Sequence, residues 1–238
     1  MRALLIILFI ITLSGIACRS VDQKIEGNGK MSSEKRSVSN ISKIKVEGGI
    51  DVVIDNGLEG ARIETDENLI PYIITVKDGE WLKITVKENA ILKSTKPILV
   101  YITTPSITEI NLAGSGNVIA NGRFSSTDKM EFGIAGSGNI TVEVNSPKIT
   151  TSISGSGSIK IAGETKEVNV DIAGSGTHDG FALKAETGIV NIAGSGDAMI
   201  YADINLKASV AGSGNIKYKG NATVEKNVTG SGDVIKEP

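Results

Sequence analysis

Hydrophobic and polar residues alternate along most of the chain from Val38 onward. Residues 43–47 read KIKVE and residues 50–54 read IDVVI, with Gly48-Gly49 between them. Alternation with a period of two residues is typical of a β-strand that buries one face. The pattern therefore predicts strands on both sides of the glycine pair.

The segment that follows predicts further short strands up to Pro105. Asn56-Gly57 supplies a turn, and residues 77–80 (KDGE) separate two alternating stretches in the manner of a hairpin. Residues 67–73 (ENLIPYI) predict a brief helical turn or loop, which Pro71 limits. Residues 97–104 predict one more strand, so no long helix is expected here.

The second half of the chain is built from repeats. The tripeptide Gly-Ser-Gly occurs seven times, at intervals of 22, 19, 19, 20, 18 and 18 residues. Its copies are Gly114-Ser115-Gly116, Gly136-Ser137-Gly138, Gly155-Ser156-Gly157, Gly174-Ser175-Gly176, Gly194-Ser195-Gly196, Gly212-Ser213-Gly214 and Gly230-Ser231-Gly232.

Alignment on the tripeptide shows regular columns on both of its sides. Two residues before it, every copy is apolar: Leu112, Ile134, Ile153, Ile172, Ile192, Val210 and Val228. Four residues before it, most are apolar or small: Ile110, Phe132, Thr151, Val170, Val190, Ala208 and Lys226. Directly after it, every copy is small and polar: Asn117, Asn139, Ser158, Thr177, Asp197, Asn215 and Asp233. Each unit thus reads as strand, turn, strand.

These columns predict an all-β fold in the form of a right-handed parallel β-helix with about 19 residues per repeat. Identical columns would stack at the strand spacing, and each buried Ile or Val would contribute roughly 1.5–3 kcal/mol. Glycine at the corners permits positive φ and close approach between coils. The alternative is an antiparallel meander or sandwich. The parallel form is favoured because Gly-Ser-Gly is not the usual two-residue hairpin turn.

His178, the only histidine, interrupts the next column, where other units have Val, Ile or Ala. Its unit is 20 residues long, so a one-residue bulge is expected to turn Phe181 inward and His178 outward. An inward histidine with a hydrogen-bond partner and a functional histidine are the alternatives.

The N-terminus predicts export. Arg2 precedes an apolar run over residues 3–13, too short to span a membrane and typical of a signal peptide over residues 1–17. Cys18 follows at once and is the only cysteine, which excludes an intrachain disulfide. A lone cysteine directly after a short apolar run resembles the bacterial lipobox, and this resemblance implies lipid attachment to Cys18. Ordinary secretion with cleavage near Ala17 is the alternative. Residues 18–37 are then expected to be a polar tether, residues 38–110 an N-terminal β-region, and residues 111–238 the repeats.

Charge and composition exclude several classes of function. Removal of residues 1–17 leaves 24 basic and 27 acidic residues without a basic stripe, so nucleic acid is not an expected partner. No cofactor is expected, because the glycines lack the strand and helix context of a phosphate loop. No metal is expected either: stacking would leave the Asp197 and Asp233 carboxylates roughly 10 Å apart.

The seven serines resemble potential nucleophiles, but a nucleophilic serine needs a base within hydrogen-bond reach. One histidine could serve at most one site, and the acidic residues share no column, so no enzyme activity is expected. A polysaccharide-active enzyme is the catalytic alternative, and it would require clustered carboxylates.

Several sequence blocks resemble a known bacterial family, the putative auto-transporter adhesin, head GIN domain. They are GNG around Asn28, SVSNISKIKVEGGIDVVI from Ser37, DENLIPYI from Asp66, KPILVYITTP from Lys96, and the AGSGN and AGSGD units. The resemblance implies an all-β repeat fold in exported, often lipid-anchored envelope proteins, and it brings no catalytic residues.

The expected function is therefore that of an outer-membrane lipoprotein, facing the periplasm or the cell surface, which presents a β-repeat surface to a glycan or protein. The alternative is a structural envelope protein that self-assembles, because the repeats end near Pro238 without a capping helix and leave an end open to a second copy.

Overall fold

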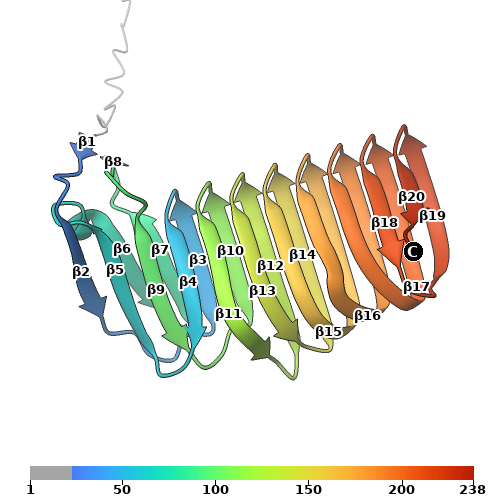
Figure 1. Cartoon of the computed structure of the whole chain (residues 1–238), viewed down its shortest axis with the longest axis horizontal. Helices are drawn as coiled ribbons and strands as arrows, with labels where there is room; N and C mark the ends of the chain where they lie inside the picture. Colours follow the sequence, from blue (N-terminus) through green and yellow to red (C-terminus); the bar gives the residue numbers. More distant parts are fainter. Residues whose placement is uncertain (1–22) are drawn as a thin grey trace, which may run out of the picture.

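The computed structural model describes residues 23–238, and this part of the chain is almost entirely β-structure (Figure 1). One 3₁₀ turn, η1 (Ile70–Tyr72), lies where residues 67–73 predicted it, and no helix among residues 23–238 is long and apolar enough to cross a bilayer. The strands are β1 (Gln23–Glu26), β2 (Met31–Arg36), β3 (Lys43–Gly48), β4 (Asp51–Asn56), β5 (Gly60–Asp66), β6 (Ile73–Asp78), β7 (Trp81–Val86), β8 (Ala90–Lys93), β9 (Leu99–Thr104), β10 (Glu109–Gly114), β11 (Asn117–Ser125), β12 (Lys129–Gly136), β13 (Asn139–Asn145), β14 (Lys148–Gly155), β15 (Ser158–Gly174), β16 (Thr177–Gly194), β17 (Asp197–Gly212), β18 (Asn215–Lys219), β19 (Thr223–Gly230) and β20 (Asp233–Lys236).

The repeats form a parallel β-solenoid of about seven turns, with about 20 residues between paired positions. The strands before each Gly-Ser-Gly pair in one parallel ladder, which runs through β3, β10, β12, β14, the second halves of β15, β16 and β17, and β19. The strands after each tripeptide form a second parallel ladder, from β4 through β11 and β13 to β20. The prediction of a parallel β-helix is confirmed, and the antiparallel alternative is wrong for the repeats.

The coils at the N-terminal end do not stack in chain order. β3 lies between β7 and β10, and β4 lies between β9 and β11. Residues 57–105 therefore supply β7 and β9, which stack on one side of the coil made by β3 and β4. The chain then returns, and β10 and β11 continue the stack on the other side of that coil. This detour explains why Lys43 pairs with Glu109, 66 positions later, where the repeats pair at 18 to 22.

Antiparallel strands close this end of the solenoid. β5 pairs with both β2 and β9, and β6 pairs with β7. The carboxylate of Asp66 is buried and accepts hydrogen bonds from the backbone N–H groups of Gly29 and Thr95 and from the Thr95 hydroxyl, each at 2.8 Å. These bonds, led by the Thr95 N–H, lower the pKa of Asp66.

The prediction of a polar tether over residues 18–37 is wrong from Gln23 onward. Residues 23–26 and 31–36 are strands β1 and β2, although most of their side chains are exposed. Backbone pairing to β8 and β5 orders them. Such pairing cannot be predicted from the composition of the segment. The signal peptide, Cys18 and the rest of the tether lie outside the described residues.

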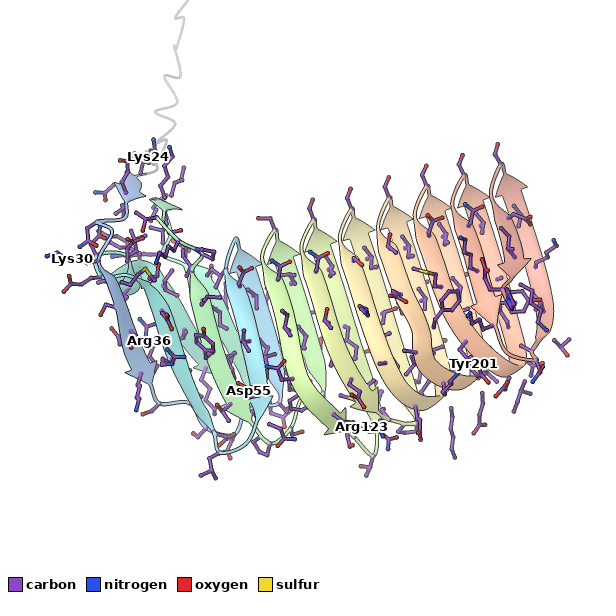
Figure 2. All side chains as sticks on the ribbon, in the orientation of Figure 1. Lys24, Lys30, Arg36, Asp55, Arg123 and Tyr201 are labelled. Carbon is purple, nitrogen blue, oxygen red and sulfur yellow. The ribbon has the colours of Figure 1, made fainter. Side chains whose placement is uncertain are left out.

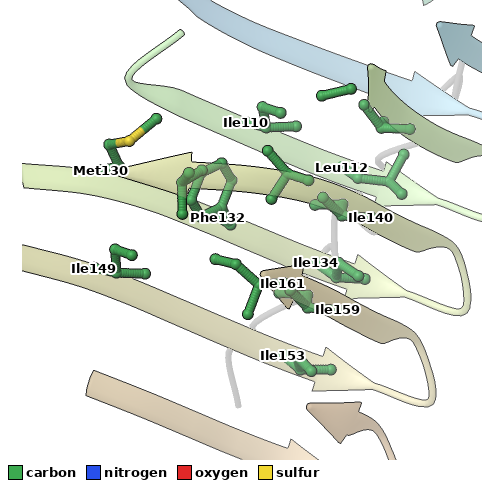
Figure 3. Packing of buried hydrophobic residues seen from close by; sticks show 14 of the residues in the cluster. Ile110, Leu112, Met130, Phe132, Ile134, Ile140, Ile149, Ile153, Ile159 and Ile161 are labelled. Atoms are coloured by element: carbon green, nitrogen blue, oxygen red, sulfur yellow. The ribbon is translucent and has the colours of Figure 1, made fainter. Parts of the chain in front are cut away.

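The core consists of the inward columns of both ladders, facing each other across a narrow interior (Figure 3). Ile134, Ile153 and Ile172 are at most 3% exposed and stack in register, as the columns predicted. Burying each such side chain contributes roughly 1.5–3 kcal/mol, so the stacked columns supply much of the stability.

The Gly-Ser-Gly tripeptides form the sharp corner of each coil. Gly174 has φ +120°, and a Cβ added to it would lie 2.5 Å from the carbonyl oxygen of Gly155 in the preceding coil. That carbonyl accepts a hydrogen bond from the Ser175 N–H at 2.9 Å. The corner therefore requires glycine for both its conformation and the contact between coils. The opposite edge of the coil is rounded, and Figure 2 shows Arg123 and Tyr201 along it.

Candidate ligand-binding groove

A long shallow groove of about 790 Å³ runs along the outer face of the first ladder. Its lining comes from eight neighbouring strands between β3 and β19, which at about 4.8 Å per strand gives a length of roughly 34 Å. The groove thus crosses the coils, and in most units three consecutive positions line it, the middle one being the inward aliphatic residue.

The floor is made of small side chains that point outward. One residue before each Gly-Ser-Gly stands a small residue: Ala113, Ala135, Ser154, Ala173, Ala193, Ala211 and Thr229. Three residues before it stands a glycine or a small polar residue: Asn111, Gly133, Ser152, Asp171, Asn191, Ser209 and Asn227. None of the described lining residues is aromatic. The floor therefore offers alanine methyl groups beside amide and hydroxyl groups that recur at the coil spacing.

Larger side chains stand beside this floor. Five residues before each tripeptide, the outward position holds Glu109, Glu131, Thr150, Asn169, Ile189, Lys207 and Glu225. Ion pairs order several of them: Lys129 lies 3.0 Å from Glu131, and Lys43 lies 3.6 Å from Glu109. In β10, β12, β16, β17 and β19 the strand therefore passes from a long side chain to the small residues of the floor.

An ion-pair cluster ends the groove at the β3 side. Glu47 lies 3.0 Å from the ammonium of Lys83 and 3.1 Å from that of Lys45, which is also a lining residue. The Lys83 hydrogen bond, with a smaller contribution from Lys45, lowers the pKa of Glu47. Glu47 and Lys83 are half-buried and Lys45 is exposed, and the cluster places charge at one end of an otherwise mostly neutral floor.

The serines of the tripeptides are exposed along the corner, and none has the setting of a nucleophile. The chain's only histidine is fully buried, and its Nδ1 lies 3.2 Å from the hydroxyl of Thr151 in the core. Within residues 23–238, no three His, Cys, Asp or Glu side chains lie close enough together to hold a metal ion.

Two stretches of the small polar column after the tripeptides form hydrogen-bonded ladders. Asn117 donates from its amide to Asp51 at 2.9 Å, and Asn139 donates to Asn117 at 2.8 Å. Further along, the backbone N–H of Asn215 donates to Asp197, and that of Asp233 donates to Asn215. These side chains satisfy each other and the backbone, so their role is to hold the corner.

The expectation that His178 turns outward is wrong. His178 stays in the inward column between Ile159 and Ala198 and is 0% exposed. The bulge exists, but it follows His178 and leaves Phe181 half-buried on the outside. Gly180 makes the difference: a Cβ there would lie 2.5 Å from His178 Nε2, so the missing side chain gives the imidazole its space.

A model of one protein family matches residues 40–222, which is more than three quarters of the chain. The chain belongs to the family described as putative auto-transporter adhesin, head GIN domain. The resemblance of the sequence blocks to this family is therefore confirmed. No curated protein matches the chain significantly.

Three solved structures of other proteins share this fold. A putative lipid binding protein from Parabacteroides distasonis is 27% identical, with a TM-score of 0.76 over 91% of this chain and 100% of that one. A putative adhesin from Parabacteroides merdae is 28% identical, with a TM-score of 0.72 over 90% and 99%. A putative adhesin from Bacteroides fragilis, at 22% identity and a TM-score of 0.83 over 90% and 100%, supports the fold alone.

The GIN-domain sequence contained one repeated pattern and one pairing that the column alignment did not identify. The small residues one and three positions before each tripeptide repeat as strictly as the inward columns, and they are the groove floor. Thr151 and His178 each place a polar side chain in an apolar column, and the structure shows that they are partners across the core.

Proposed function

We propose that this GIN-domain protein is a non-catalytic binding module of the cell envelope, which takes an extended ligand in the groove. The observation that carries the proposal is the groove itself, which repeats the same small polar and alanine positions across seven strands, from β10 to β19. A site of this length suits a polymer better than a compact molecule, because each coil offers the ligand the same few groups.

The ligand class that fits best is a glycan chain or an extended polypeptide segment. The amide and hydroxyl groups of the floor can exchange hydrogen bonds with either, and the alanine methyls accept the less polar faces of the ligand. Membership of an adhesin family supports binding at an extracellular or surface location. A lipid acyl chain is the second candidate, favoured by the alanine floor and by the description of the Parabacteroides distasonis structure as a lipid binding protein.

The absence of a catalytic constellation from residues 23–238 supports a non-enzymatic role. Hydrolysis of a glycan needs two carboxyl groups at a defined separation across the bond. Asp171 is the only carboxylate that lines the groove among the described residues, and it accepts a hydrogen bond from Asn191 at 2.9 Å. One carboxylate without an acid partner does not meet that requirement.

Filling the groove floor with long side chains should weaken binding. We expect Ala173→Arg combined with Ala193→Arg to weaken binding at least tenfold, about 1.4 kcal/mol, because two long side chains would occupy adjacent floor positions. Residues 23–238, which hold all the contacts described above, would be labelled and applied to arrays of glycans, extended peptides and lipids.

The matched control adds the same two charges to the opposite face. Ile119 and Thr141 are exposed, outward-facing and paired in adjacent coils of the second ladder. Ile119→Arg with Thr141→Arg should leave binding unchanged. If no compound on any array binds the wild type, or if both pairs of variants lose binding equally, the groove is not the binding site.

We further propose that lipid on Cys18 holds the module at a membrane. Cys18→Ser removes the only thiol in the chain, so the protein should move from the membrane fraction to the soluble fraction. The check is fractionation together with labelling by radioactive palmitate. A variant that still carries the label would show that the lipid is attached elsewhere.

A further inference from the structure

The two ends of the solenoid differ in whether further strands cover their edge strands. At the N-terminal end, β2, β5 and β6 cover the coils with antiparallel pairs. At the C-terminal end, β19 pairs only with β17 and β20 pairs only with β18, and both lie at the limit of the stack (Figure 1). Within residues 23–238, the last coil therefore leaves one edge of each ladder open.

This open end has features that attract a second copy. In a parallel ladder, alternate residues direct their N–H and C=O groups to opposite sides, so half of these groups in β19 and β20 lack a strand partner. The core is also less covered here. Val224 and Val228 are half-buried, whereas their column neighbours Leu206 and Val210 are 1% and 2% exposed.

Two lysines occupy inward positions of this last coil. Lys226 pairs in register with the fully buried Ala208, and Lys236 pairs with Tyr218, which packs against the core. Both lysines are exposed because no further coil covers them. Lys226 has one weak partner, the Asp233 carboxylate at 3.7 Å, in a pair that is 60% exposed on both sides.

We propose that Lys226 and Lys236 keep the open end of the solenoid from stacking on a second copy. A coil placed over this end would bury both ammonium groups among apolar columns, and a symmetric pair of ends would bring lysines of the two copies toward each other. Burying an unpaired charge is costly, and this cost opposes the gain from added strand pairing. Inward-pointing lysine on an edge strand is a recognised protection against edge-to-edge pairing. The structure thus favours an isolated binding module over a self-assembling envelope protein.

The test replaces both lysines with apolar residues, so that the inward columns of the last coil become apolar. Residues 23–238 with Lys226→Val and Lys236→Ile would be compared with the wild type by light scattering after size exclusion. We expect the wild type to remain one copy per particle over the whole concentration range and the double variant to double its mass. Far-UV circular dichroism would establish that both are folded.

Two further variants locate the effect. Lys160→Ile with Lys166→Val removes two exposed lysines from middle coils and adds the same apolar groups, and it should remain monomeric. Val228→Lys, added to the double variant Lys226→Val with Lys236→Ile, returns a positive charge to the same end and should restore the monomer. A wild type that already dimerises, a double variant that stays monomeric, or equal association of the control would each overturn the proposal.

Discussion

Ile172→Asp should destabilise the solenoid by about 4 kcal/mol or more, the largest effect expected of any single substitution discussed. Ile172 is 2% exposed and stacks between Ile153 and Ile192. An aspartate there would lose the packing of the isoleucine and place a carboxylate among apolar side chains. Because each coil contacts only its neighbours, loss of this coil should also release the coils beyond it.

Thermal unfolding of residues 23–238 measures this effect. Domains of this size lose roughly 2–4 °C of melting temperature per kcal/mol, so a decrease of about 10 °C or outright unfolding is expected. Ala173→Asp is the matched control, since Ala173 is the next residue and points outward. It should change stability by about 0.5 kcal/mol or less. Equal losses in the two variants would contradict the inward assignment of Ile172.

Stability should fall by about 3 kcal/mol between pH 7 and pH 4 because of His178 alone. Burial lowers the pKa of His178 to about 4, from 6.5 in an exposed histidine. Between these two values the unfolded chain binds a proton that the folded chain excludes, so acid favours unfolding. Above pH 6.5 neither state binds the proton and the loss disappears.

His178→Ile should remove this dependence, because the neighbouring coil already holds Ile159 at the same inward position. Urea unfolding of both proteins at pH 7.5, 6 and 5 gives the difference in slope. Carboxylates such as Asp66 also lose stabilising bonds in acid, but both proteins share them, so the comparison cancels their contribution. Parallel stability curves would show that the pKa of His178 is the same in the folded and unfolded states, which would contradict its burial without a charge partner.

The repeat architecture could be predicted from the sequence because each physical requirement repeats in register. Ile134, Ile153 and Ile172 recur at the interval of one coil, and parallel stacking is the arrangement that buries all of them together. The glycines of the tripeptides predicted the corners for the same reason. Local pattern and long-range pairing therefore agree in this part of the chain.

The N-terminal end could not be predicted in the same way. β3 pairs with β7 and β10 across different chain separations, and no repeat in the sequence marks that order. β1 and β2 carry mostly exposed polar side chains, so their backbone pairing left no hydrophobic pattern to detect. His178 was misjudged because the space for its ring comes from Gly180, two residues away.

Recognition of the groove required the structure for a related reason. Small outward residues next to an alternating strand are compatible with any solvated face, and Ala173 or Ser154 alone indicates nothing. Only stacking of the coils turns them into one continuous floor beside longer side chains. The column of small residues is visible in the sequence. That it forms a groove floor depends on which face of the ladder the rest of the structure leaves uncovered.

The most direct measurement uses the absence of cysteine from residues 23–238. Ala193→Cys and, separately, Lys160→Cys would carry an environment-sensitive fluorophore in the groove and on the opposite face. Each would be titrated with soluble surface polysaccharide, peptidoglycan fragments, a pool of extended peptides and a fatty acid. A ligand groove predicts a saturable emission change at position 193 with at least one probe and none at position 160. Equal emission changes at both positions, or no emission change at position 193 with any probe, would contradict the assignment of the groove as the ligand site.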